Sequence, residues 1–126
     1  MKVPYRCVYN HELLILATSQ TPYCTYDEPV SDRQAIGLVE ELKGTGVDAL
    51  TICPQAWQTN LWVSKIDRRW QDQAPKEKEP LFETSVKYNT KAYYRIRRYM
   101  MEGKDPVALT IRTARSCNIA PFLSYR

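Results

Sequence analysis

Two apolar runs on either side of an amphipathic segment constrain the fold of this chain more than any other feature. The first run is ELLILATSQ, at residues 12–20, and the second is VDALTIC, at residues 47–53. Each run has the length and composition of a strand that is buried on both faces. Residues 11–53 therefore predict a strand, a helix and a second, parallel strand, which together form a βαβ unit.

The segment between the two runs carries the signals of a helix. Ser31 with Gln34 three residues later is a capping box. Apolar residues then recur at the spacing of a single helix face, at Ala35, Leu38, Val39 and Leu42. Gly44 and Gly46 predict the end of this helix and a short turn into the second strand.

The second half of the chain repeats the alternation after a long interruption. Residues 54–90 are polar and lack periodicity, which predicts a long loop insertion. Residues 90–103 allow a helix, and a second helix follows, with Asp105 at the N-cap and Pro106 at the first helical position. The run IAPFLSYR, at residues 119–126, then predicts a third strand.

The resulting fold class is α/β, with parallel strands alternating with helices. The chain has 126 residues, of which 44% are hydrophobic and 25% charged, so residues 1–126 are expected to form a single domain. Because three parallel strands leave much of their surface uncovered, this order predicts the opening third of a (β/α)8 (TIM) barrel. A smaller three-layer sheet is the alternative architecture.

Composition narrows the function classes. A net charge of +4 is weak support for a nucleic-acid partner. Four scattered cysteines and one histidine predict reduced thiols and no metal site. The GTG at residues 44–46 precedes a strand instead of following one, so no phosphate-binding loop and no cofactor are expected. The apolar run near the N-terminus is too short for a signal peptide or a membrane span, which predicts a cytoplasmic protein.

Three stretches together cover nearly the whole chain: PYRCVYNHELLILATSQTPY, VEELKGTGVDALTICPQAWQTNLWVSKID and RRYMMEGKDPVALTIRTARSCNIAPFLSYR. These stretches resemble the N-terminal portion of large glycoside hydrolases with TIM-barrel catalytic domains. The resemblance implies a carbohydrate ligand. It also implies that the catalytic acid and nucleophile lie on later barrel strands, beyond residue 126, so that this chain alone is inactive.

In a barrel, the loops that follow the strands form the active-site face. Trp57 and Trp62 fall in the loop after the second strand, where indole rings could stack on sugar rings and Gln55 could hydrogen-bond to hydroxyl groups. Alternatively, the tryptophans pack this loop onto the barrel rim. The remaining candidate substrate-binding residues are Ser64, Lys65, Ser124 and Arg126.

No catalytic residue can be named from the sequence. Glycoside hydrolysis ordinarily needs two carboxyl groups. Asp48 falls at the entry of the second strand, Asp105 is explained as a cap, and the spacing assigns no partner to Asp27, Glu28 or Asp67. The single histidine, His11, is expected before the first strand, as a surface or core residue.

Two other functions remain open. Tyr93, Tyr94, Arg95, Arg97 and Arg98 mix aromatic rings with positive charge, as single-stranded nucleic-acid binders do. The neighbouring acidic residues and the amphipathic pattern favour an ordinary helix instead. A third interpretation is a homo-oligomer without enzymatic activity, formed by pairing of an exposed sheet edge.

Overall fold

The computed structural model describes residues 5–13, 15–18, 29–56, 59–60 and 95–124. In chain order the elements are β1 (Val8–Glu12), α1 (Ile15–Thr18), α2 (Asp32–Glu40), β2 (Ala49–Cys53), β3 (Gln55–Ala56), β4 (Thr59–Asn60), α5 (Pro106–Ser116) and β5 (Ala120–Leu123). Residues 95–101 are also helical.

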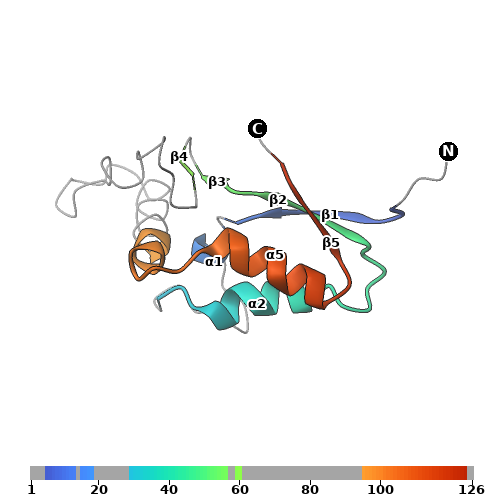
Figure 1. Cartoon of the computed structure of the whole chain (residues 1–126), viewed down its shortest axis with the longest axis horizontal. Helices are drawn as coiled ribbons and strands as arrows, with labels where there is room; N and C mark the ends of the chain where they lie inside the picture. The colour runs from blue at the N-terminus through green and yellow to red at the C-terminus, as the bar shows by residue number, and fades with distance from the viewer. Residues whose placement is uncertain (1–4, 14, 19–28, 57–58, 61–94, 125–126) are drawn as a thin grey trace.

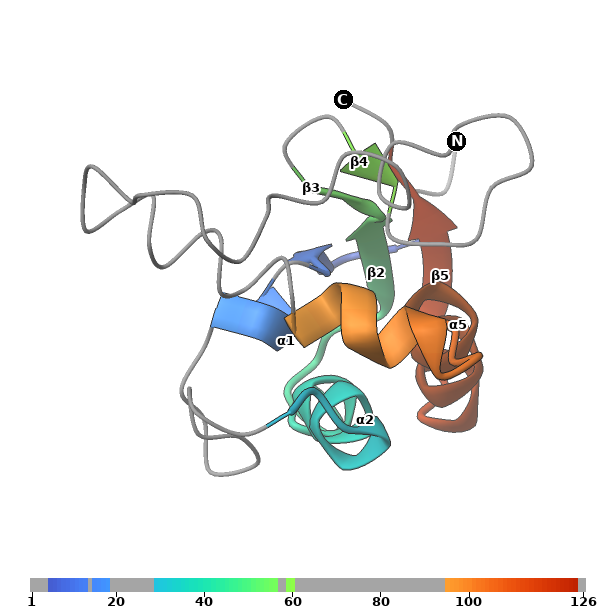
Figure 2. The ribbon, with the colours of Figure 1, turned by 90° about the vertical axis from the view of Figure 1, so that its left-hand side faces the viewer.

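The main sheet has three parallel strands in the order β1-β2-β5, which confirms the predicted α/β class with parallel strands. The register places Val8 opposite Ala49, and Ala49 opposite Ala120. Helices α2 and α5 lie side by side on one face of this sheet (Figures 1 and 2). Strand β2 therefore lies beside β1, and β5 lies on the other side of β2. The helices that precede β2 and β5 in the chain, α2 and α5, cover the same face of the sheet.

The hydrophobic core lies between the central strand and these helices. Leu50 and Ile52 of β2 are fully buried, because α2 and α5 both pack over the face of β2 from which these side chains project. The other buried members of the cluster lie in the helical segments or in the residues that directly flank helices and strands: Leu13, Leu16, Val30, Ala35, Val39, Ile96, Tyr99, Met100, Val107, Ala114 and Ile119.

The predicted first strand is wrong in position. The strand is Val8–Glu12, and the apolar residues that follow it form the short helix α1 instead. Leu13 and Leu16 are both buried, and the Leu16 N–H donates to the Leu13 carbonyl in a helical turn. Over so few residues, an apolar run has the same composition in a buried strand and in a buried helical turn, so periodicity could not separate them.

The two principal helices agree with their predicted signals. The capping box is present: the Gln34 N–H donates to Ser31 Oγ at 3.3 Å, and the Ser31 N–H donates to Gln34 Oε1 at 3.4 Å. Gln34 is buried, and its Nε2 also donates to the Leu16 carbonyl, which ties α2 to α1. Helix α2 ends before the predicted glycines, and Gly44 and Gly46 take positive φ angles of 80° and 87° in the turn that follows.

The start of α5 provides a direct test of local stability. Asp105 accepts a hydrogen bond from the Ala108 N–H at 2.9 Å, and Pro106 occupies the first turn. We expect Asp105→Ala to lower the free energy of unfolding by about 1 kcal/mol, because it leaves a helical N–H without its cap. Urea denaturation followed by circular dichroism measures the change. Asp105→Asn retains a capping oxygen and should cost much less; equal losses would contradict a capping role.

Only the start of the predicted loop insertion at residues 54–90 lies within the described residues. Strands β3 and β4 pair as an antiparallel ladder, with Gln55 opposite Asn60 and Ala56 opposite Thr59. Residues 61–90 lie outside the described part of the chain.

Candidate functional site

The face of the sheet away from α2 and α5 is the most distinctive surface of the described residues. Strand side chains alternate between faces, so the burial of Leu50 and Ile52 under the helices assigns Thr51 to the opposite face. Its register partners are Asn10 of β1 and Phe122 of β5. No described helix or strand lies over this face, which we call the open face.

One row of the open face combines hydrogen-bonding groups with an aromatic ring. The Thr51 hydroxyl lies 3.1 Å from Asn10 Oδ1 and 3.3 Å from the Tyr9 carbonyl, in position to donate to either. Phe122 is 44% exposed, and its ring meets Tyr5 edge-on, with the ring centres 5.3 Å apart. An amide, a hydroxyl and an aromatic ring therefore share one accessible row across the three strands.

The carboxyl ends of the strands meet beside this row. Glu12 is the last residue of β1, is exposed, and pairs with Cys53 at the end of β2. The Leu13 N–H donates to the Cys53 carbonyl at 3.2 Å, and the Ser124 N–H donates to the Ile52 carbonyl at 2.8 Å. This edge is where open and closed parallel sheets bind their ligands.

Glu12 was missed by the sequence analysis. It stands at the head of the apolar run that was predicted as a strand, and in that position it would lie at the amino end of the sheet. Because the strand actually lies earlier, Glu12 moves to the carboxyl edge and onto the open face, by alternation from Asn10. The alternating pattern VYNHE is the signal that could have located this strand.

His11 lies inside β1, and the prediction that it precedes the first strand is wrong. The core interpretation is confirmed, since the side chain is only 3% exposed, and its Nε2 has no hydrogen-bond partner among the described residues. Desolvation by burial lowers the pKa of His11 to about 4. The imidazole is therefore neutral at pH 7 and belongs to the helix-covered face, beside Tyr9.

Asp48 stands at the opposite edge of the sheet, before β2. Its Oδ2 accepts hydrogen bonds from the backbone N–H groups of Arg6 (2.9 Å) and Cys7 (3.2 Å), and these bonds hold the pKa of the carboxyl below its usual value. This carboxylate fixes the chain that leads into β1, so it has a structural role, far from the carboxyl edge.

Two of the predicted binding residues fall within the described chain. Gln55 opens β3 directly after β2, and half-buried Ser124 follows β5, so both follow parallel strands at the carboxyl edge. The other predicted positions lie outside the described residues: Trp57, Trp62, Ser64, Lys65 and Arg126.

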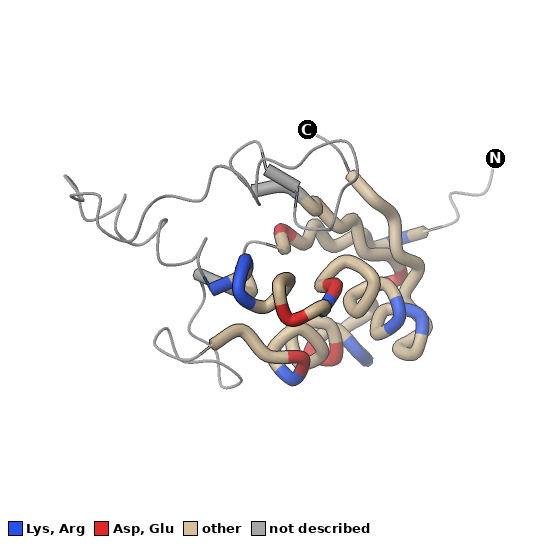
Figure 3. Tube along the Cα trace, turned by 60° about the vertical axis from the view of Figure 1, so that its left-hand side comes forward, with Lys and Arg blue, Asp and Glu red and all other residues tan. Residues whose placement is uncertain are grey.

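The basic segment at residues 95–101 does not present a continuous cationic surface. Arg95 is buried, and Arg98 lies 3.6 Å from Glu102. Tyr99 is also buried; burial and the hydrogen bond that its hydroxyl donates to Asp32 raise its pKa. Acidic and basic residues are intermixed over the described helices (Figure 3), which weakens the nucleic-acid interpretation.

Neither a metal-binding cluster nor a membrane-spanning helix is formed by the described residues. These residues contain no group of three or more histidine, cysteine or acidic side chains placed to hold a metal ion. Within the same ranges, no helix is long and apolar enough to cross a membrane. Of the cysteines described, Cys7 is exposed, Cys53 is buried and Cys117 is half-buried, and each is a free thiol.

Comparison with known proteins adds no assignment. No protein-family model matches the chain, and no significant match appears among curated protein sequences.

Proposed function

We propose that the open face binds a carbohydrate. The observation that carries this proposal is the row formed by Asn10, Thr51 and Phe122, which offers an amide, a hydroxyl and an exposed aromatic ring on one surface. Sugars present apolar ring faces edged by hydroxyl groups, so they are recognised by aromatic stacking together with neutral hydrogen-bonding side chains.

We further propose that the sheet is part of a (β/α)8-barrel-like architecture. The strand order β1-β2-β5 adds each strand on the same side, and α2 and α5 share one face. In a doubly wound sheet, later strands are added at the opposite edge of the sheet, and helices cover both faces. In a barrel, successive strands are added at the same edge and all helices lie outside. In a barrel the open face is the interior, and Glu12, Gln55 and Ser124 lie toward its mouth.

The proposal concerns binding and not hydrolysis by these residues alone. A glycosidase ordinarily places two carboxyl groups across the scissile bond. Glu12 supplies one carboxyl group at the carboxyl edge, while Asp48 lies at the opposite edge and Asp105 caps α5. A second carboxyl group would have to come from outside the described residues.

Isothermal titration calorimetry with cellohexaose, xylohexaose, maltohexaose and chitohexaose tests the proposal. We expect at least one hexaose to bind, and Phe122→Ala to weaken that binding about fivefold to tenfold through loss of a stacking surface. Tyr9→Ala is the matched control, because Tyr9 is 41% exposed, similar to Phe122 at 44%, but projects from the other face of the sheet.

The controls separate the competing interpretations. Binding of none of the four sugars, or an equal loss in Tyr9→Ala, would contradict a carbohydrate site on the open face. Binding of a single-stranded oligonucleotide that weakens steeply with salt would favour the nucleic-acid alternative instead, since phosphate contacts release counterions.

A further inference from the structure

Glu12 is the one charged side chain that the described strands place on the open face. By alternation and register, this face carries Val8, Asn10 and Glu12 from β1, Ala49, Thr51 and Cys53 from β2, and Ala120 and Phe122 from β5. Glu12 is exposed at the end of β1. The open face therefore offers a ligand a negative charge at its carboxyl edge.

The charge of Glu12 is opposite in sign to the net charge of the chain, which is +4. Arg6 precedes β1 at the amino edge of the sheet, where it lies 3.8 Å from Asp48. Glu12 takes part in an interaction within its own chain. A carboxylate has about four acceptor positions, so Glu12 can also accept hydrogen bonds from a ligand.

Glu12 and the aromatic ring of Phe122 are placed to meet one extended ligand. They lie on β1 and β5, two strand spacings apart, and Glu12 is one side-chain repeat beyond Asn10 in the row of Phe122. With about 4.8 Å between strands and about 6.6 Å between residues on one face of a strand, their Cα atoms are about 12 Å apart. This span is longer than one pyranose ring, so an oligosaccharide that stacks on Phe122 reaches Glu12 with a neighbouring ring.

We propose that Glu12 makes the open face selective for oligosaccharides that carry ammonium groups, such as glucosamine oligomers, over neutral and acidic ones. This inference rests on the proposed carbohydrate site and names its substrate class. An ammonium group donates charge-assisted hydrogen bonds to a carboxylate, and these are roughly twice as strong as neutral ones. A uronic acid would instead bring two like charges together.

Isothermal titration calorimetry with three hexaoses of different charge tests this selectivity, in a mildly acidic buffer that protonates the amines. The sugars are glucosamine hexaose, its N-acetylated counterpart chitohexaose, and the glucuronic acid hexamer of the same linkage. We expect glucosamine hexaose to bind about threefold to tenfold more tightly than chitohexaose, and the glucuronic acid hexamer to bind most weakly. Nonspecific attraction to a chain of net charge +4 predicts the reverse order, so the order itself reports a local carboxylate.

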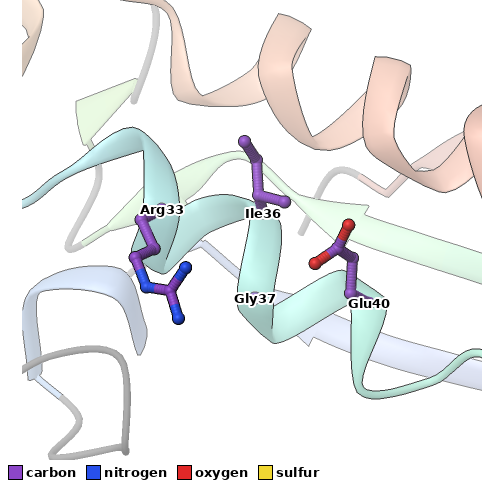
Figure 4. Close-up of a pocket in the computed structure, with 4 residues that line it drawn as sticks. All are labelled: Arg33, Ile36, Gly37 and Glu40. Carbon is purple, nitrogen blue, oxygen red and sulfur yellow. The ribbon is translucent and has the colours of Figure 1, made fainter.

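Two substitutions assign the selectivity to one side chain. Glu12→Gln should abolish the preference for glucosamine hexaose over chitohexaose, because it removes the charge and keeps the size of the side chain. Glu40→Gln is the matched control, since Glu40 is also exposed but lies on α2, where it lines a hollow of about 270 Å³ with Arg33, Ile36 and Gly37 (Figure 4). This variant makes the same change in net charge and should retain the preference. Circular dichroism melts verify that each variant folds.

The outcomes separate this inference from the proposed function. Equal binding of glucosamine hexaose and chitohexaose, tighter binding of the glucuronic acid hexamer, or a preference that survives Glu12→Gln overturns the inference and leaves a carbohydrate site intact. A preference that is lost in Glu40→Gln also overturns it, because the ammonium groups would then respond to α2 or to net charge. Binding of no sugar at all overturns both the inference and the proposed function.

Discussion

Leu50→Ala is expected to lower the free energy of unfolding by about 2–5 kcal/mol. Leu50 lies on the central strand β2, has no exposed surface, and belongs to the core cluster to which α2 and α5 also contribute. Its truncation removes apolar contacts and leaves a cavity that the strand and two helices cannot collapse around. Urea denaturation followed by circular dichroism measures the loss.

Leu123→Ala provides the comparison within the same sheet. Leu123 is 53% exposed at the end of β5, so its truncation removes little buried surface and should cost less than about 1 kcal/mol. Equal losses at Leu50 and Leu123 would contradict the position of the core between β2 and the helices.

Acidification should destabilise the protein through His11 by about 3 kcal/mol in total. The unfolded chain binds a proton at His11 with a pKa near 6.5, whereas burial lowers the folded pKa to about 4. The unfolded state therefore gains protons first as pH falls. The stability contributed by neutral His11 is fully present above pH 6.5 and is lost progressively between pH 6.5 and about 4.

Two measurements isolate this effect. His11→Gln removes the titrating group, so the loss of stability between pH 6.5 and 4 should be smaller in the variant than in the wild type. The lowered pKa of Asp48 acts at more acidic pH, because its contribution is lost only below its usual value of 3.8. Because the chain contains one histidine, NMR titration reports its imidazole without ambiguity. A folded-state pKa near 6.5 would contradict the buried position.

Local signals explain which elements could be predicted from the sequence. The capping box of Ser31 and Gln34 and the Asp105 cap with Pro106 specify helix starts through residues only a few positions apart, and both helices begin there. Strand β2 was also predicted, because a central strand is buried on most of its length and gives a continuous apolar run.

Strand β1 could not be recognised in the same way, because it lies at an edge and one of its faces is open. Val8, Asn10 and Glu12 are exposed, so the strand lacks the apolar run that marks β2. The adjacent run, with Leu13 and Leu16, has the stronger hydrophobic signal but is a helical turn whose burial depends on tertiary packing.

The candidate site depends on that same tertiary information. Asn10, Thr51 and Phe122 are separated by tens of residues, and only the register of three strands brings them into one row. Gln55 and Ser124 could be placed after strands from the sequence, because that needs only the ends of β2 and β5. Side chains could not be assigned to the open face before the register of β1 was known.

The most direct test of the carbohydrate proposal is an NMR titration of the ¹⁵N-labelled chain with the hexaose that binds most tightly among the four. We expect the largest shifts in amide resonances at Asn10, Thr51 and Phe122 and at their neighbours along the carboxyl edge, with small shifts in α2 and α5. Absence of a binding hexaose, or shifts concentrated in the helices, would contradict a carbohydrate site on the open face of the sheet.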